Sequence, residues 1–207
     1  MKSFLIANPK GGSGKSTLAV NLAGYFASRG HGVMLGDADR QQSSRDWLGL
    51  RSALLPKIHA AIIGKDARIR APEGTTRVVL DTPAGLRGKA LESILKRIDR
   101  VVVPVQPSIF DILAARGFIE TLMEEKAVRK EKVFIAVVGM RVDARTRAAA
   151  ELERFLESCG LPVLTYLRDT QLYVQTAANG MTIFDLSFSR AEKDLEQWAP
   201  LLEWVGS

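Results

Sequence analysis

Short runs of aliphatic and β-branched residues alternate along this chain with longer stretches in which apolar residues recur every three or four positions. This alternation is typical of parallel strands joined by helical crossovers. The runs that predict core strands lie at residues 4–7, 33–35, 78–80, 101–103, 133–138 and 163–164. We therefore predict an α/β fold with a doubly wound, mostly parallel twisted sheet flanked by helices.

The stretch between the first two runs shows the clearest helical pattern. Leu18, Leu22 and Phe26 recur every four residues, and Gly30 suits the left-handed position that ends a helix. We predict a helix from about residue 14 to residue 29. Residues 51–74 are the least periodic part of the chain, and an irregular excursion is predicted there.

Length and composition limit the architecture and the location of the protein. A chain of 207 residues that is 46% hydrophobic is the size of one globular domain, so residues 1–207 are predicted to form a single domain. The chain has no uncharged apolar run of about 18 or more residues, which is the length needed to span a bilayer, and no signal peptide is recognised. A cytoplasmic protein without stable membrane insertion is expected. Cys159, His31 and His59 are far apart in sequence and predict neither a disulfide nor a metal site.

A glycine-rich segment, Asn-Pro-Lys-Gly-Gly-Ser-Gly-Lys-Ser-Thr, occupies residues 8–17 between the first strand and the first helix. Its glycines let successive backbone N–H groups point inward and, with the positive end of the helix, form a cradle for phosphate oxygens. Lys15 adds a charge at the β- and γ-phosphates, and the Ser16 hydroxyl is a ligand that Mg²⁺ prefers. The alternative is a glycine turn that only caps a helix. The predicted ATP contacts are Lys10, Gly11, Gly12, Ser13, Gly14, Lys15, Ser16 and Thr17.

This loop departs from the strict phosphate-loop pattern, because Pro9 stands where that pattern has a glycine. Residues 10–17 instead resemble the deviant Walker A motif of the ParA/MinD family of ATPases, Lys-Gly-Gly-x-Gly-Lys-Ser/Thr-Ser/Thr, at every fixed position. The resemblance implies a sandwich homodimer with ATP, in which Lys10 reaches the nucleotide of the second protomer and acts in catalysis with Lys15. From the residues alone we infer only that a second cation beside the triphosphate would stabilise the negative charge that develops during phosphoryl transfer.

Two carboxylates, Asp37 and Asp39, follow the second predicted strand. The segment is similar to the family's Asp-x-Asp-Pro-Gln sequence, although Arg40 replaces the proline. The resemblance implies that Asp39 positions the attacking water and belongs to the Mg²⁺ surroundings, and that Asp37 lies close to the metal. The alternative is a pair of loop acids that balance nearby cations.

Further segments resemble the family at the ends of later strands. An apolar run delivers Asp81, a Walker B type carboxylate that reaches Mg²⁺ through water. The loop after Asp81 is similar to the family's Asp-x-Pro-Pro sequence with one proline lost, and residues 103–108 match a segment that turns past the nucleotide. The resemblance therefore adds the nucleotide contacts Asp37, Asp81, Gln106, Met140, Arg141, Arg168 and Asp169, the last four near the adenine.

No additional acid, base or nucleophile suggests that a second substrate is transformed, so ATP hydrolysis alone is expected. Dethiobiotin synthetase shares this type of loop and stays open as an alternative, to be tested by carboxylation of a diamine. The nitrogenase iron protein also shares the loop but needs cluster-binding cysteines, and this chain has one cysteine.

The family divides mainly into ATPases that move on DNA and ATPases that move on membranes. Membrane-riding members end in a basic amphipathic helix, whereas residues 190–207 carry two cations against four carboxylates, which anionic lipid repels. The net charge of +6 permits attraction to nucleic acid. A partition ATPase that binds DNA non-specifically is therefore favoured, and a membrane-associated or cargo-scaffolding ATPase of the MinD type is the alternative. The candidate DNA contacts are Arg145, Arg147, Arg168 and Arg190.

The resemblance also implies a location and a partner. Such ATPases associate with the nucleoid and act with a ParB-like centromere-binding protein or a cargo adaptor. The first predicted strand begins within the first few residues, which leaves no room before it for a helix-turn-helix domain. Sequence-specific operator binding is therefore not expected.

Overall fold

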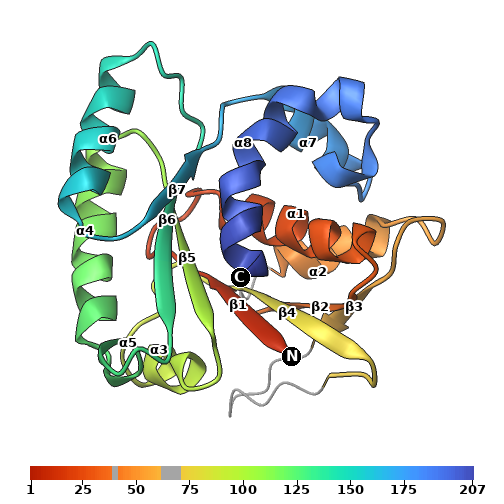
Figure 1. The fold of residues 1–207 in the computed structure, drawn as a ribbon, viewed down its shortest axis with the longest axis horizontal. Helices are drawn as coiled ribbons and strands as arrows, with labels where there is room; N and C mark the ends of the chain where they lie inside the picture. Colours follow the sequence, from red (N-terminus) through yellow and green to blue (C-terminus); the bar gives the residue numbers. More distant parts are fainter. Residues whose placement is uncertain (39–41, 62–70) are drawn as a thin grey trace.

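The computed structural model describes residues 1–38, 42–61 and 71–207, in which seven parallel strands form one sheet between two layers of helices (Figure 1). The strands are β1 (Lys2–Ile6), β2 (Gly32–Asp37), β3 (Ile58–Ala61), β4 (Thr75–Asp81), β5 (Arg100–Val105), β6 (Phe134–Gly139) and β7 (Val163–Tyr166). Their order across the sheet is β3-β2-β4-β1-β5-β6-β7, and every pairing is parallel. The predicted α/β fold is thus confirmed.

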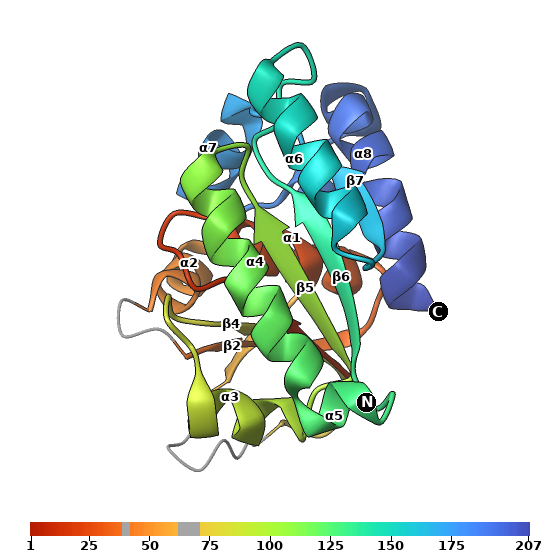
Figure 2. The same ribbon diagram turned by 90° about the vertical axis from the view of Figure 1, so that its left-hand side faces the viewer.

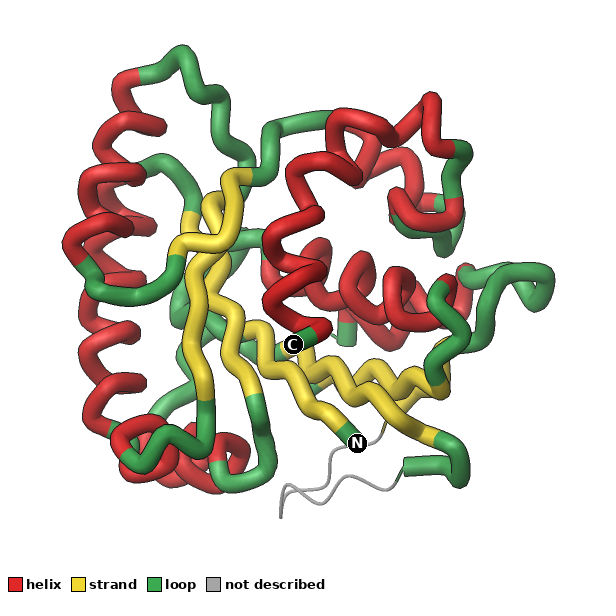
Figure 3. The backbone as a smooth tube through the Cα atoms, viewed as in Figure 1, coloured by secondary structure: helices red, strands yellow, loops and turns green. Residues whose placement is uncertain are grey.

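The helices are α1 (Lys15–Ser28), α2 (Ser43–Leu50), α3 (Gly88–Leu95), α4 (Ile109–Glu124), α5 (Lys126–Arg129), α6 (Arg147–Ser158), α7 (Gln171–Ala178), the 3₁₀ helix η1 (Ile183–Asp185) and α8 (Phe188–Gly206). α3, α4, α5 and α6 cover one face of the sheet, and α1, α2, α7 and α8 lie on the other (Figures 1 and 2). Figure 3 separates the strands, in yellow, from these two helical layers.

The pleat of the strands divides the core into two halves. Phe4 and Ile6 of β1 pack with α1 and α8, whereas Leu5 packs with α3, α4 and α6 on the opposite face. Consecutive side chains of a strand point to opposite faces, so a strand buried on both sides reads as a continuous apolar run. This is why the six runs in the sequence predicted six of the strands.

The prediction for residues 51–74 was wrong in part. β3 lies inside this stretch and pairs with β2, with Val33 opposite Ile58 and Gly36 opposite Ala61. Its four residues, Ile-His-Ala-Ala, carry little intrinsic β preference, so the strand forms because β2 offers a partner edge. Residues 62–70 lie outside the described part of the chain.

The strand register brings three strand ends together at one edge of the sheet. Ile6, the last residue of β1, is the partner of Asp81 in β4, and Asp81 is in turn the partner of Asp37 in β2. The chain enters the glycine-rich loop directly after Ile6. The glycines and the two carboxylates therefore meet at the carboxyl edge, where open α/β sheets bind ligands.

The last helix, α8, packs its apolar side against the domain. Trp198, Leu201 and Val205 are fully buried there, and the Trp198 indole N–H donates a hydrogen bond to the Tyr173 hydroxyl at 2.9 Å. Within the described residues, none of the helices combines the length and the apolar character needed to cross a bilayer.

We predict that Gly24, in the middle of α1, cannot be replaced by alanine without loss of stability. A Cβ at this position would lie 2.4 Å from the Thr182 Cγ2 atom. Alanine improves helix propensity by about 1 kcal/mol, but overpacking of this kind costs about 1–3 kcal/mol. Gly24→Ala should therefore lower the free energy of unfolding, measured in urea, by up to about 2 kcal/mol.

The matched control is Gly117→Ala in α4, where an added Cβ meets no atom within 4 Å. It should leave stability unchanged or raise it by up to about 1 kcal/mol, because only helix propensity changes. If both variants are equally stable, the contact between α1 and Thr182 does not limit this position.

Candidate nucleotide-binding site

The glycine-rich loop wraps around the amino terminus of α1 with two left-handed residues. Gly12 has φ 76° and Gly14 has φ 94°, a region that residues with a Cβ rarely adopt. A Cβ at Gly14 would also lie 2.8 Å from the Met140 Cε atom. The Gly14 carbonyl accepts the first helical hydrogen bond, from the Leu18 N–H at 2.9 Å. Glycine at position 14 is therefore needed both for the turn and for the close approach of Met140.

Side chains from the neighbouring strand ends hold the base of the loop. The buried Asn8 side chain donates to the Pro104 carbonyl at 2.7 Å and accepts from the Lys10 N–H at 2.8 Å. Gln106 donates to the Gly12 carbonyl at 2.5 Å. The structure thus places Gln106 beside the loop, and its predicted contact with the nucleotide stays a prediction. The sequence analysis did not single out Asn8, although an amide directly after a buried strand was a usable signal.

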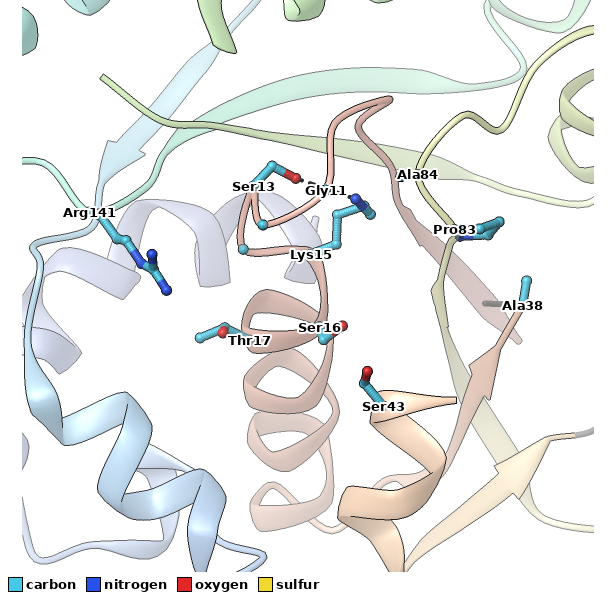
Figure 4. A pocket seen from close by; sticks show the side chains of 12 residues that line it. Gly11, Ser13, Lys15, Ser16, Thr17, Ala38, Ser43, Pro83, Ala84 and Arg141 are labelled. Carbon is cyan, nitrogen blue, oxygen red and sulfur yellow. Dashed lines mark hydrogen bonds between the residues drawn. The ribbon is translucent and has the colours of Figure 1, made fainter. Parts of the chain in front are cut away.

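The Lys15 ammonium group lies inside the loop. It donates to the Lys10 carbonyl at 2.8 Å and is 3.4 Å from the Ser13 hydroxyl, and the residue is buried. A cavity of about 620 Å³ opens beside it. Figure 4 shows this cavity with Lys15, Ser16 and Thr17 on one side and Ser43, Pro83 and Ala84 on the other. Gly11, Gly12, Ser13 and Gly14 also line it, so seven of the eight residues predicted to hold the triphosphate surround one space.

Asp81 ends β4 at the floor of this site. One carboxylate oxygen accepts a hydrogen bond from the Ser44 hydroxyl at 2.5 Å, and the other is buried without a hydrogen-bond partner. Burial raises the pKa of the Asp81 carboxyl above its usual value. Hydrogen bonds from Ser16 and Ser44 and the charge of Lys15 oppose this shift, while the charge of Asp37 adds to it.

These residues fit a magnesium ion. Asp81 offers a buried oxygen without a hydrogen-bond partner, and the Ser16 hydroxyl is hydrogen-bonded to the same carboxyl group. In the described part of the chain no three His, Cys, Asp or Glu side chains gather as a metal cage. Mg²⁺ commonly uses only one or two protein oxygens, and water and substrate phosphates supply the rest. One hydroxyl and one carboxylate are therefore an adequate protein contribution.

Asp37 orders the helix that follows it. Its carboxylate accepts the backbone N–H groups of Ser44 at 2.8 Å and Arg45 at 3.3 Å, which caps the amino end of α2. The cap brings Ser43 to the wall of the cavity and Ser44 to Asp81. The sequence analysis missed both serines. Asp39 lies outside the described residues, and its water-positioning role stays a prediction.

Lys10 does not line the cavity. Its ammonium group forms an ion pair with the Asp111 carboxylate of α4 at 2.5 Å, and the two side chains are 37% and 7% exposed. The same carboxylate accepts a hydrogen bond from Ser108, the residue that caps α4. In the single chain, therefore, Lys10 is held at the rim of the site by its own protomer.

A second cavity of about 480 Å³ shares Gly14, Thr17 and Arg141 with the first. The four residues predicted near the adenine, Met140, Arg141, Arg168 and Asp169, all line it. The structure thus offers one space for phosphates and an adjoining space for a base, and the adenine contacts themselves stay predictions. The residues that the sequence analysis missed here are Thr170, Gln171, Tyr173, Val174 and Ala177.

Two of the four predicted DNA contacts are bound to carboxylates of the chain itself. Arg168 is bound to the buried Asp194 carboxylate by hydrogen bonds of 3.0 and 2.8 Å, and Arg145 is bound to Asp143 at 2.9 and 2.8 Å. Arg147 and Arg190 are exposed, on α6 and α8. Residues 141–207 carry seven lysines and arginines against ten aspartates and glutamates. DNA binding by these arginines therefore remains a prediction.

Comparison with known proteins agrees with this site. The profile of the CobQ/CobB/MinD/ParA nucleotide binding domain matches residues 4–183. The chain belongs to this family. The resemblance to ParA/MinD proteins that the sequence motifs suggested is thereby confirmed.

Several members of the ParA/MinD family are similar along most of the chain. "Maintenance of carboxysome distribution protein A" of Gloeobacter kilaueensis is 31% identical over 189 residues, which cover 86% of this chain and 82% of that protein. "Chromosome-partitioning ATPase Soj" of Thermus thermophilus is 28% identical over 191 residues, or 76% of each protein.

Solved structures in the ParA/MinD family share the fold. An ATP complex of Cyanothece McdA has a TM-score of 0.71 at 17% identity and covers 97% of this chain and 96% of that one. The septum site-determining protein MinD of Pyrococcus horikoshii, complexed with Mg-ADP, has a TM-score of 0.70 at 16% identity and covers 99% and 95%. At these identities the likeness concerns the fold alone.

We predict that Asp81→Asn raises the melting temperature of the nucleotide-free protein at neutral pH. The native carboxyl has a raised pKa, so its ionised form disfavours the folded state above that pKa, and asparagine removes the charge but can still accept from Ser44. The stability gain should be largest at neutral pH. It should shrink as the pH falls toward the ordinary value of about 4 and disappear below that value, where both states of the parent are protonated.

The same variant should lose the extra thermal stabilisation that Mg²⁺ adds to ATP. Both effects are measured by thermal unfolding between about pH 4 and 8, with and without Mg-ATP. A stability difference that does not change with pH would contradict the assignment of the effect to this ionisation.

Proposed function

We propose that this chain is a positioning ATPase that binds Mg-ATP, forms a homodimer around it and hydrolyses it to move a cargo along DNA. The observation that carries the proposal is one cavity at the carboxyl edge of the sheet that is lined by the glycine cradle, Lys15 and Ser16, with the buried Asp81 carboxyl hydrogen-bonded to Ser16 beside it. The relatives named for partition and for carboxysome distribution support a positioning role.

In the proposed hydrolysis, the chain supplies binding, orientation and charge. Backbone N–H groups of residues 11–16 hold the phosphate oxygens, and the Lys15 ammonium moves from the Lys10 carbonyl to the β- and γ-phosphates. Ser16 and Asp81 would hold Mg²⁺, which supplies positive charge to the phosphate oxygens. Asp39 orients the attacking water in line with the γ-phosphate.

The dimer is proposed from the position of Lys10. Its ammonium is at the rim of the cavity and does not line it, so it is placed to leave the chain and reach the phosphates of a second protomer. Asp111 is 7% exposed, and its carboxylate keeps the hydrogen bond from Ser108 when Lys10 leaves. A triphosphate offers Lys10 more negative charge than one carboxylate does, and this difference is proposed to drive the exchange.

We predict that Lys10→Ala and Asp111→Asn act in opposite directions on dimerisation. Lys10→Ala should keep the ATP affinity within about tenfold but lose ATP-dependent dimerisation and hydrolysis, because its target belongs to the partner. Asp111→Asn frees the lysine and should strengthen ATP-dependent dimerisation by at least about fivefold, because an ion pair with one buried partner is worth no less than about 1 kcal/mol, the upper range of exposed pairs. Analytical ultracentrifugation with and without ATP measures both.

The control is Glu120→Gln, which removes an exposed carboxylate from the same helix and should change neither property. The proposed exchange is wrong if Asp111→Asn weakens the dimer as Lys10→Ala does, or if Lys10→Ala still dimerises and hydrolyses ATP at the parent rate.

DNA is the proposed track, and the cytoplasmic nucleoid the proposed location. The net charge is +6, and the apolar side of α8 is packed inside the domain, which leaves it unable to enter a bilayer. Residues 141–207 have more acids than bases, so one protomer should attract DNA only weakly, through its exposed Arg147 and Arg190. An ATP-bound dimer presents these arginines twice, and the paired contacts should bind DNA usefully. A ParB-like protein or a cargo adaptor is the proposed stimulating partner.

We predict that DNA binding requires ATP, ignores sequence and falls steeply with salt. The slope of log affinity against log salt should be about −0.9 for each phosphate contact. Arg147→Ala and Arg190→Ala should each reduce the slope by about one contact, whereas Lys57→Ala, an exposed cation outside α6 and α8, should not. Fluorescence anisotropy with two unrelated duplexes over a salt series makes the measurement.

Two further variants serve as controls for this assay, one that cannot bind ATP and one that cannot hydrolyse it. Lys15→Ala should not bind ATP and so should not bind DNA, and Asp39→Ala should bind both but stay on DNA because it cannot hydrolyse ATP. DNA binding that is equally strong without ATP would overturn the proposed switch. ATP-dependent co-sedimentation with anionic vesicles, and no binding to DNA, would instead establish the membrane-associated alternative.

A further inference from the structure

The end of the sheet opposite to the nucleotide site carries a separate cavity. It has a volume of about 460 Å³ and lies where the last turn of α3 meets α5, next to the start of β1. Figure 2 shows α3, α5 and the amino terminus together at this end of the molecule, away from the tips of the strands. The nucleotide site uses none of the residues that line it.

The charged residues around this cavity leave an excess of positive charge. The cations are Lys96, Arg97, Lys126, Lys130 and Lys132, and the acids are Glu92, Asp99 and Glu125.

Two of the three acids are already engaged. Glu92 pairs with Lys96 at 2.7 Å, and the Asp99 carboxylate accepts from the Ser3 N–H and hydroxyl at 2.7 Å each. With Glu92 and Lys96 paired, four cations face the two carboxylates of Asp99 and Glu125, and among the described residues none of these four cations forms an ion pair. An anionic ligand would therefore meet few carboxylates of the chain that compete for these cations.

The floor of the cavity is apolar. Leu95 and Ile98 line it from the α3 side and Ala127 from α5, and Leu95 and Ile98 are core residues that are 1% and 4% exposed. Pockets that hold organic ligands and peptide side chains combine such an apolar floor with a few polar groups at the rim. A DNA duplex presents phosphates along a convex rod and would leave this floor uncovered, and a concave site does not insert into a lipid surface.

We propose that this cavity binds an acidic peptide segment of a partner protein, with one apolar side chain on the Leu95–Ile98 floor and carboxylates on the surrounding lysines. The site is at the amino-terminal edge of the sheet, so its occupant competes neither with ATP nor with the face on which Lys10 lies. Binding is therefore independent of nucleotide. The inference does not rest on the proposed function, and it gives the chain a means of holding a partner throughout the ATP cycle.

The test uses a fluorescent peptide of Glu and Asp residues with one central leucine, and its anisotropy with the nucleotide-free full-length protein at low salt. The charge-reversal variants are Lys126→Glu and Lys130→Glu, both at exposed positions. Each should weaken binding at least tenfold, while Lys193→Glu on α8, equally exposed, should stay within twofold of the parent. A peptide with serine in place of leucine should bind at least threefold more weakly, which reports the apolar floor.

ATP turnover of Lys126→Glu and Lys130→Glu should equal that of the parent, which shows that the variants are folded and separates this proposal from the proposed ATPase. No binding of the leucine peptide by the parent at about 1 mM protein overturns the inference, since that excludes even a weak site. An equal loss in Lys193→Glu also overturns it. So does nucleotide-free binding of duplex DNA or anionic vesicles that displaces the peptide and is lost in Lys130→Glu, since the site would then serve another class of polyanion.

Discussion

The parallel pairing of β1 with β4 is the contact on which the site depends. It sets Ile6 opposite Asp81, and the pairing of β4 with β2 sets Asp81 opposite Asp37. A shift of one residue would turn every side chain of a strand to the other face, so the burial of both faces fixes the register strongly. The phosphate cradle, which begins just after β1, and the two carboxylates therefore keep their relative positions without any bound nucleotide.

This arrangement places a carboxylate in a buried position, where its ionised form lowers the stability of the nucleotide-free protein. Asp81 is 1% exposed, its pKa is raised by burial, and one of its oxygens has no partner. A buried oxygen without a hydrogen bond costs free energy, and a cation is the partner that would recover it. Natural proteins break the rules of core formation mainly at functional sites. The unpaired oxygen of Asp81 is the feature of the nucleotide-free protein that supports the proposed Mg²⁺ site.

Much of the fold and of the glycine-rich loop could be predicted, because both are determined by short, contiguous stretches of sequence. Six strands appear as apolar runs, and the loop at residues 10–17 carries its own glycines, lysine and serine. β3 could not be predicted, because its stability comes from the edge of β2. Asp39 falls outside the described residues, so the structure adds nothing to its predicted role.

The contacts that were missed join residues far apart in the chain. Lys10 and Asp111 are separated by 101 positions, and Ser44 and Asp81 by 37. A single sequence shows the residue types but not such pairings. Arg168, a predicted adenine and DNA contact, has a distant partner of the same kind, because its Nε and one terminal nitrogen donate to the Asp194 carboxylate of α8 at 3.0 and 2.8 Å. An arginine is a candidate for a ligand only once its own carboxylate neighbours are known.

The distribution of charge differs between two parts of the chain. Residues 1–140 carry 22 lysines and arginines against 13 aspartates and glutamates, whereas residues 141–207 carry 7 against 10. The net charge of +6 therefore does not describe the surface of α6 and α8, and part of the excess lies around α3 and α5. At physiological salt, charges separated by more than about 8 Å are largely screened, so each surface attracts its ligands by its local charge. Under the proposed function, arginines in this net acidic part of the chain would hold DNA only when two protomers act together, so the ATP-dependent dimer, rather than the overall charge, would control attachment to DNA.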